Sequence, residues 1–150
     1  MQGSGIKIMK VFIGGNGNLS FEDFCHYYAT ALNKLLEKNS DAHFLVCDFR
    51  GVDVLAMEYL KCRTSNVMVH HMGSRARYVP DQFRTYVNEW KFIGGYSNNW
   101  ERDQATLKDC THYLAYDFNS DQSRKSGTQK NIEVCQRMGK IFLPDELGKK

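Results

Sequence analysis

Short apolar runs alternate with segments of helical periodicity along most of this chain. The runs are rich in β-branched and aromatic residues, as strands are, and they are Ile6–Ile13, Phe44–Cys47, Asn66–His71, Tyr113–Phe118 and Lys140–Leu143. Apolar positions within a run are nearly continuous, which is typical of strands buried on both faces of a parallel sheet. The pattern therefore predicts an α/β fold, a doubly wound parallel sheet of about five strands with helices on both faces.

Between these runs, apolar residues recur at spacings of three and four, the period of an amphipathic helix. The segments concerned are Phe21–Leu35, Val54–Leu60, Asp81–Trp90, Glu101–Cys110 and Ile132–Met138. We expect an irregular loop at Phe92–Trp100, where two consecutive glycines interrupt the aromatic residues. We leave Met1–Gly5 outside the fold as a possible remnant of cloning, and we treat residues 6–150 as a single domain, because no linker or repeat divides them.

Small and polar residues follow three of the predicted strands, at the end where each strand stops. They are Gly14–Asn16, Asp48–Asp53 and, just before a helix, Ser126–Thr128. The first free N–H groups of a helix bear the positive end of its dipole, so Ser126–Thr128 predicts an anion site. Helix capping and tight turns explain the same residues without a ligand. Because the carboxyl ends of parallel strands share one edge, the three segments together favour a binding site for an anionic small molecule.

Composition narrows the class of protein. The net charge of +3 is too small to indicate nucleic acid by itself, and no apolar run is long enough to span a membrane. Five cysteines without a C-x-x-C pair predict reduced thiols, and the five histidines have no metal-ligand spacing with them. No leader of the secretory type is visible. We therefore expect a cytoplasmic protein with no metal, no cofactor, no membrane contact and no indicated nucleic-acid partner.

Four blocks of the sequence, taken in order, carry a family resemblance. They are VFIGGNG at Val11–Gly17, RGVDVLAMEY at Arg50–Tyr59, the pair Arg102 and Asp103, and SGTQKN at Ser126–Asn131. With these blocks, residues 8–145 resemble the SLOG superfamily of Rossmann-like proteins, which includes the lonely-guy nucleotide hydrolases, the DNA-processing Smf proteins and the small YspA-like nucleotide sensors. The resemblance implies a Rossmann-like domain that binds a nucleotide or a nucleotide derivative, in the manner of a sensor.

The resemblance and the strand-end pattern together indicate which residues bind this ligand. The expected set is Gly14, Gly15, Asn16, Arg50, Gly51, Asp53, Arg102, Ser126, Gly127, Thr128 and Asn131. Within this set, we expect the Ser126–Thr128 turn to hold a phosphate and Arg102 to neutralise it. The first loop departs from the G-S-R of the YspA-like branch, because Asn16 stands in place of the arginine. A guanidinium that would bind phosphate is thereby lost. Arg75 and Arg77 are the candidates to replace it.

An alternative function is hydrolysis or transfer at the N-glycosidic bond of a nucleotide. The lonely-guy branch follows its Gly-Thr turn with a catalytic glutamate, but the matching position here is Asn131, which cannot act as a general base. The catalytic candidates are then Arg102, which matches the arginine of that branch, and the carboxylates of Asp103 and Glu58. Two further carboxylates near these blocks are Glu101 and Glu133.

Aromatic residues are dense in the third quarter of the chain, at Tyr86, Trp90, Phe92, Tyr96 and Trp100. Apolar surfaces of that size often mark an interface. Since SLOG-like proteins are often dimers, we expect a homodimer. Packing of this stretch on the core, or its closure over the ligand as a lid, is the alternative interpretation.

Overall fold

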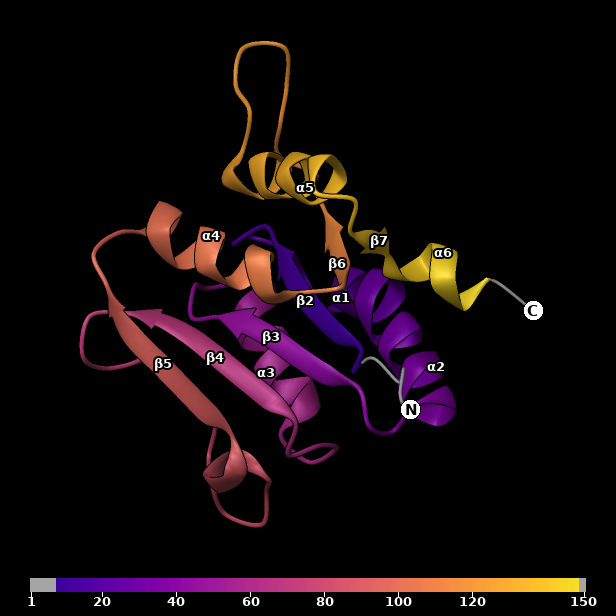
Figure 1. The fold of residues 1–150 in the computed structure, drawn as a ribbon, viewed down its shortest axis with the longest axis vertical. Helices are drawn as coiled ribbons and strands as arrows, with labels where there is room; N and C mark the ends of the chain where they lie inside the picture. Colours follow the sequence, from indigo (N-terminus) through magenta and orange to yellow (C-terminus); the bar gives the residue numbers. More distant parts are fainter. Residues whose placement is uncertain (1–7, 149–150) are drawn as a thin grey trace, which may run out of the picture.

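Six parallel strands form one sheet in the computed structural model, which describes residues 8–148 (Figure 1). The strands are β2 (Lys10–Gly15), β3 (His43–Cys47), β4 (Val67–Met72), β5 (Lys91–Tyr96), β6 (His112–Tyr116) and β7 (Ile141–Phe142). Their order across the sheet is β5-β4-β3-β2-β6-β7. The predicted α/β class and parallel sheet are confirmed, with six strands in place of about five. Met1–Gly5, the first two residues of the first predicted strand, and residues 149–150 lie outside the described residues.

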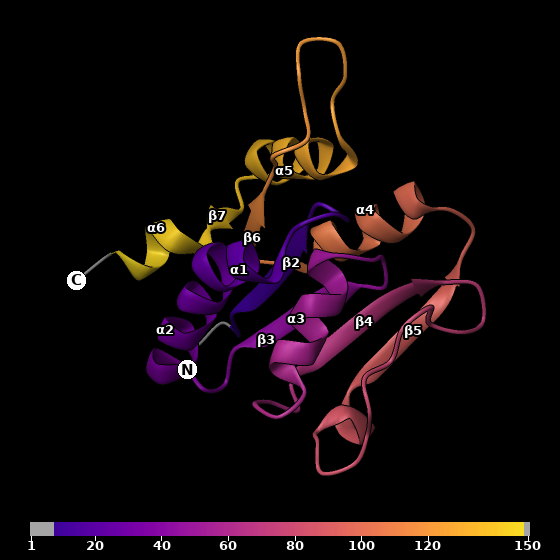
Figure 2. The ribbon, with the colours of Figure 1, turned by 180° about the vertical axis from the view of Figure 1, so that it is seen from behind.

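Helices connect the strands and cover both faces of the sheet (Figures 1 and 2). They are α1 (Phe21–Phe24), the π-helical η1 (Cys25–Ala29), α2 (Thr30–Lys38), α3 (Val52–Leu60), α4 (Asn99–Asp109), α5 (Gly127–Arg137) and α6 (Leu143–Leu147). Helices α1, α2, α3 and α6 pack on one face, and α4 and α5 pack on the other. This arrangement is the doubly wound one that the sequence predicts.

The chain reverses its direction across the sheet at β2. From β2 the strands are added on one side through β3, β4 and β5, and α4 then returns the chain so that β6 pairs with the other side of β2. Helices on the two sides of such a reversal diverge and leave a crevice at the carboxyl ends of the strands. The crevice lies at the edge where the sequence predicts a ligand.

The central strands are buried on both faces, which explains their nearly continuous apolar sequences. Successive side chains of a strand point to opposite faces. On β2, Val11 and Ile13 join the core beneath α1, α2 and α3, whereas Phe12 joins the smaller core beneath α4 and α5. On β6, Leu114 joins the first core and Tyr113 joins the second. Both faces of the sheet are therefore covered by apolar cores, and the place open to a ligand is the edge where the carboxyl ends of the strands lie.

Tyr28 fixes the ends of β2 and β6 relative to each other. Its fully buried hydroxyl donates to the Gly14 carbonyl at 2.8 Å and accepts from the Tyr116 amide at 3.0 Å. Burial raises the pKa of this hydroxyl well above its usual value, so it stays protonated at neutral pH. The side chain projects from η1, and π-helical turns are frequent near functional sites. Gly15 must be a glycine, because a Cβ there would lie 2.4 Å from the Tyr28 hydroxyl.

The prediction of a helix over Asp81–Trp90 is wrong. Only the short 3-10 turn η2 (Val87–Glu89) is helical in this segment. A carboxylate oxygen of Asp81 accepts from the Phe83 amide at 2.9 Å and closes a turn instead. Arg84 then has a φ of 56°, which no right-handed helix contains. The helical spacing was misleading because Phe83 is 73% exposed and does not pack against the sheet.

The irregular loop predicted at Phe92–Trp100 is also wrong, because β5 and the start of α4 occupy most of it. β5 is an edge strand, and most of its residues are exposed, so it has no apolar pattern. The two glycines that suggested a loop are instead required by the local geometry of β5. A Cβ at Gly94 would lie 2.1 Å from the His71 ring, and Gly95 has a φ of 92°.

The aromatic stretch is divided between the core and the surface. Trp90 is buried, and its indole N–H donates to the Thr64 carbonyl at 2.9 Å. Phe92 packs against the core, whereas Trp100 is 60% exposed. The stretch therefore does not form one continuous exposed surface, and the homodimer expected from it stays a prediction. None of the helices within residues 8–148 is both long and apolar enough to cross a bilayer.

Candidate functional site

A cavity of about 410 Å³ lies at the carboxyl ends of β2, β3 and β6, where the strand order reverses. Its walls come from the loop after β2, the loop between β3 and α3, and the first turns of α4 and α5. All but two of the predicted site residues line it: Gly14, Gly15, Asn16, Arg50, Asp53, Arg102, Asp103, Ser126, Gly127, Thr128 and Asn131. The fold thus brings together segments that lie far apart in the sequence.

The first turn of α5 presents free backbone amides to this cavity. Ser126 is the N-cap residue, and its hydroxyl oxygen accepts from the Gln129 amide at 3.0 Å. The amides of Gly127 and Thr128 donate no hydrogen bond within residues 8–148. A Cβ added at Gly127 would meet no atom within 4 Å, so the approach to these amides is open. Free N–H groups at the positive end of a helix dipole form an anion site.

Asn16 and Asp117 tie the loop after β2 to the loop after β6. The Asn16 amide nitrogen donates to the Asp117 carboxylate at 2.9 Å, and its oxygen accepts from the Phe118 amide at 2.8 Å. The Ser126 hydroxyl also donates to Asp117, at 2.6 Å. Partial burial opposes ionisation of Asp117, but hydrogen bonds from Ser120, Ser126 and Asn16 outweigh it and lower its pKa to about 2. Asn16 therefore positions the wall of the cavity, and it does not replace the missing arginine.

Arg102 lines the cavity, but two carboxylates hold its guanidinium. Its Nη1 lies 3.2 Å from Asp48 Oδ1, and its Nη2 lies 2.8 Å from Asp103 Oδ1. Arg77 binds Asp48 from the other side, with Nη2 3.1 Å from Oδ1. Arg102 is 4% exposed and Asp48 is 2% exposed. Because its charge is already compensated, Arg102 has little left to offer a phosphate, and the phosphate contact expected of it stays a prediction.

Asp53 is the carboxyl group in this cluster that forms no ion pair with a cationic side chain of the described residues. It is 6% exposed, and its Oδ2 accepts from the Phe49 amide at 3.0 Å. Burial raises its pKa to about 7, the Phe49 amide and Arg102 oppose this rise, and the nearby Asp103 and Asp48 add to it. A carboxyl group with this pKa exchanges its proton near neutral pH, which is unusual outside functional sites.

Gly51, a predicted ligand-binding residue, lies behind the cavity wall instead of in it. Its φ is 77°, and a Cβ there would lie 2.4 Å from the Asn16 carbonyl oxygen. The residue permits close contact between the loop that precedes α3 and the loop that follows β2. Its role is therefore to hold the two loops together.

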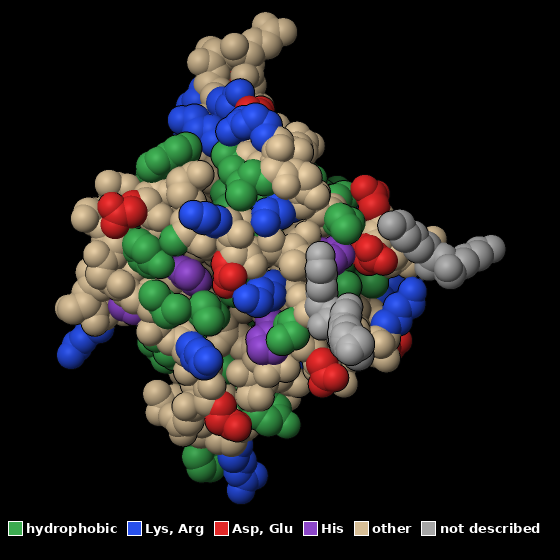
Figure 3. Space-filling model, viewed as in Figure 1, with side chains coloured by type: hydrophobic (Ala, Val, Ile, Leu, Met, Phe, Trp, Pro, Cys, Tyr) green, Lys and Arg blue, Asp and Glu red, His purple; other side chains and the backbone are tan. Residues whose placement is uncertain are grey.

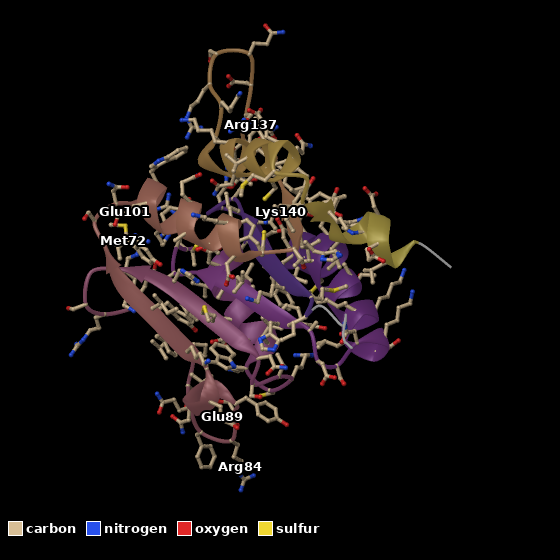
Figure 4. All side chains as sticks on the ribbon, viewed as in Figure 1. Met72, Arg84, Glu89, Glu101, Arg137 and Lys140 are labelled. Carbon is tan, nitrogen blue, oxygen red and sulfur yellow. The ribbon has the colours of Figure 1, made fainter. Side chains whose placement is uncertain are left out.

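Glu58, a predicted catalytic residue, lies outside the cavity. It projects from α3 toward Lys61, 2.6 Å away, and it accepts a short hydrogen bond from the Tyr78 hydroxyl. The other glutamates are engaged as well. Glu101, in the first turn of α4 and labelled in Figure 4, accepts from the Ser97 amide at 3.3 Å, and Glu133 binds Lys125 at 2.7 Å. None of these three glutamates lines the cavity.

Two arginines of the cavity wall have guanidinium groups that form no ion pair within residues 8–148. They are Arg50, which lies over the Phe49 ring, and Arg124. Arg124 comes from the segment after β6, which projects above α5, and basic side chains gather around its base (Figures 1 and 3). In the sequence, Arg124 belongs to a loose basic cluster with Lys125 and Lys130 beside the predicted anion site, but it was not among the predicted site residues. Arg75 and Arg77, the expected substitutes for an arginine, do not line the cavity.

No group of three or more His, Cys, Asp or Glu side chains within residues 8–148 is arranged to hold a metal ion. The five cysteines are free thiols. The chemistry available in the cavity is therefore that of backbone amides, guanidinium groups, amide side chains, the hydroxyl groups of Ser126 and Thr128, the Cys47 thiol, and the carboxyl groups of Asp53 and Asp103.

Comparison with known proteins identifies a similar fold. No protein-family model matches the sequence, and no curated protein matches it. Among solved structures, the chain is similar to DNA processing protein A from Helicobacter pylori, described for its unique single-stranded DNA binding mode. The match covers 93% of this chain and 78% of that chain, with 12% sequence identity and a TM-score of 0.55.

This similarity corrects one expectation. From the sequence we expected no nucleic-acid partner, yet a protein with the same fold binds single-stranded DNA. The net charge of a protein does not predict whether it binds nucleic acid, because binding depends on the local charge. In this chain the net charge is only +3, yet Arg50 and Arg124 both line one cavity. The chain thus shares a Rossmann-like fold with a DNA-processing protein, and the cavity described above lies at the reversal in strand order.

Proposed function

We propose that the cavity binds a nucleotide, with the phosphate group at the first turn of α5. The observation that carries this proposal is the pair of free amides at Gly127 and Thr128, which open on a cavity at the reversal in strand order. The volume of about 410 Å³ suits one small ligand. Phe12 and Phe49 supply apolar surface beside the polar groups, as a nucleobase requires.

The charges around the cavity support an anionic ligand. The guanidinium groups of Arg50 and Arg124 form no ion pair with the side chains of residues 8–148, and both line the same cavity as the free amides. The helix dipole attracts an anion by about 0.3–1 kcal/mol at an exposed site, and a charge-assisted hydrogen bond adds about 1.5–3 kcal/mol. Together they predict that a nucleotide binds about 20- to 900-fold more tightly than its nucleoside.

We also propose that the chain belongs to the SLOG superfamily and acts as a nucleotide sensor. The support is the position of the SGTQKN block at the start of α5 and of the RGVD block at the start of α3, both beside the cavity. A sensor needs only to bind its ligand. Arg102 is already paired with carboxylates, and no glutamate is among the residues that line the cavity, so the cavity suits binding better than hydrolysis.

The proposal is tested with AMP, GMP, CMP and UMP, each beside its nucleoside. A thermal-shift screen selects the nucleotides that stabilise the protein, and calorimetry then measures both members of each pair. Equal affinity of nucleotide and nucleoside would contradict a phosphate site. The same samples are checked for free base, because its release would show that the alternative, cleavage of the N-glycosidic bond, takes place.

Single-stranded DNA is a second candidate ligand, which the fold of DNA processing protein A favours. The exposed Arg124 and Lys125 flank the cavity, and Phe118 and Trp100 are 50% and 60% exposed. Basic and aromatic side chains together bind single strands through phosphates and stacked bases. Anisotropy of labelled oligothymidylates separates the candidates. Affinity that rises with strand length and falls steeply with salt supports DNA, whereas equal binding of thymidine monophosphate and of all lengths supports a single nucleotide.

A further inference from the structure

A cluster of charged side chains at the wall of the cavity contains one more carboxylate than guanidinium. Its carboxylates are Asp48, Asp53 and Asp103, and its guanidinium groups are Arg77 and Arg102. Asp48 is shared by both arginines, and Asp103 pairs with Arg102. Asp53 forms no ion pair within the part of the chain that the structure describes, although it is only 6% exposed. A buried charge without a partner is costly, and a proton on Asp53 makes the cluster neutral.

The hydrogen bonds of Asp53 determine where this proton resides. Oδ2 accepts from the Phe49 amide at 3.0 Å, so the proton belongs on Oδ1. Oδ1 has no hydrogen-bond partner within residues 8–148 and is not fully buried. Because Asp53 lines the cavity, the accessible Oδ1 is the atom that a ligand can reach. A protonated Asp53 is therefore a hydroxyl donor at the wall of the cavity.

We propose that Asp53 binds the nucleotide as a protonated acid and donates a hydrogen bond from Oδ1 to an acceptor atom of the ligand, so that nucleotide and proton bind together. The inference rests on the proposed nucleotide-binding function and adds a residue that determines specificity. Ligands that present a carbonyl oxygen, a ring nitrogen or a phosphate oxygen at this point are favoured, whereas an N–H or O–H group there competes with the donor. The cavity therefore selects acceptor-bearing nucleotides at neutral pH.

The titratable and charged groups that face Asp53 determine how nucleotide binding depends on pH. They are Asp48 after β3, Cys47 on β3, Tyr28 on η1, and Arg102 and Asp103 on α4. Burial raises the pKa of Cys47 and of Tyr28, so both stay neutral as the pH rises. Asp53 is then the group that loses a proton above pH 7. Loss of that proton removes the donor and adds a negative charge, and both changes weaken binding of an anion.

The first test is calorimetry of the tightest-binding member of the AMP, GMP, CMP and UMP panel at pH 7.0 and 8.5. A nucleotide phosphate is mostly ionised over this range and changes little. With a carboxyl pKa of about 7, the dissociation constant of the wild type should rise about 15-fold. Parallel titrations in PIPES and Tris at pH 7.5 should show uptake of about 0.8 proton. An unchanged dissociation constant would overturn the proposal.

Asp53→Asn is the matched variant, because its amide is neutral, accepts from Phe49 and donates to the cavity. It should bind the nucleotide equally well at both pH values, take up no proton, and exceed the wild-type affinity at pH 8.5. Asp41→Asn, in an exposed turn, should keep the wild-type pH dependence. If Asp53→Asn takes up as many protons as the wild type, another group titrates and the proposal is wrong.

NMR titration of the Asp53 carboxyl carbon in the unliganded wild type needs neither a ligand nor a variant. A midpoint near pH 7 is expected, and a midpoint below pH 5 would overturn the proposal whatever nucleotides do. If the midpoint is near pH 7 but no nucleotide binds, the proposed nucleotide-binding function is wrong, and so is the hydrogen bond from Asp53 to a nucleotide. If nucleotides bind and the midpoint is below 5, the function stands without this role of Asp53.

Discussion

Replacing Arg102 by alanine should lower the free energy of unfolding by about 3–5 kcal/mol, the usual cost of breaking a buried ion pair. The substitution removes both guanidinium contacts, at 3.2 Å to Asp48 and 2.8 Å to Asp103, and leaves two carboxylates in a buried site. Arg77 continues to compensate Asp48, so Asp103 bears most of the loss. Urea unfolding followed by circular dichroism measures the change.

Lys10→Ala is the matched control for this experiment. The Lys10–Asp109 pair has a similar distance of 3.0 Å, but its side chains are 36% and 41% exposed. An exposed pair contributes about 1 kcal/mol or less, so the control should unfold almost as the wild type does. If Arg102→Ala were equally mild, the Arg102 guanidinium would not be committed to the protein. It would then be available to a phosphate, as the sequence suggested.

Replacing Gly127 by aspartate should raise stability and abolish nucleotide binding. Gly127 is the first residue of α5, its φ is not left-handed, and an added Cβ meets no atom within 4 Å. A carboxylate at a helix N-terminus stabilises the helix by about 0.3–1 kcal/mol. The same carboxylate occupies the place proposed for the phosphate. Two like charges about 5 Å apart repel by about 3 kcal/mol at an effective dielectric constant of about 20, which weakens binding about 100-fold.

Gly127→Asn separates charge from size in this second experiment. Asparagine has the same shape as aspartate, so it obstructs the amides equally but adds no charge. Thermal unfolding and calorimetry with the tightest-binding nucleotide are run on both variants. We expect the aspartate variant to bind much more weakly than the asparagine variant. Equal affinity of the two variants and the wild type would place the phosphate away from α5.

The sequence was sufficient to predict the sheet and the edge at which the cavity lies. Buried strands such as β2 and β6 have continuous apolar runs, and Ser126 and Gly127 are residues that helix starts favour. These signals are local, because burial on both faces and helix capping restrict the residues within each element. The position of the cavity then follows from the rule that parallel strands share one carboxyl edge.

The pairing of Arg102 could not be predicted from the sequence. Asp48 follows β3 and Arg102 lies on α4, 54 positions further along the chain, and only the crossing of α4 over the sheet brings them together. The proton on Asp53 depends on the same three-dimensional balance of charge. β5 was missed for a related reason, since Gly94 is required by the His71 ring of the neighbouring strand.

The central claim is that the amides at the start of α5 bind the phosphate of a nucleotide. It is tested most directly by ¹⁵N–¹H spectra of the protein, titrated with the tightest-binding nucleotide of the panel and, separately, with its nucleoside. The account predicts that the Gly127 and Thr128 amides shift with the nucleotide and move little with the nucleoside. It would be contradicted if the nucleotide bound, with shifts elsewhere, while these two amides stayed in place.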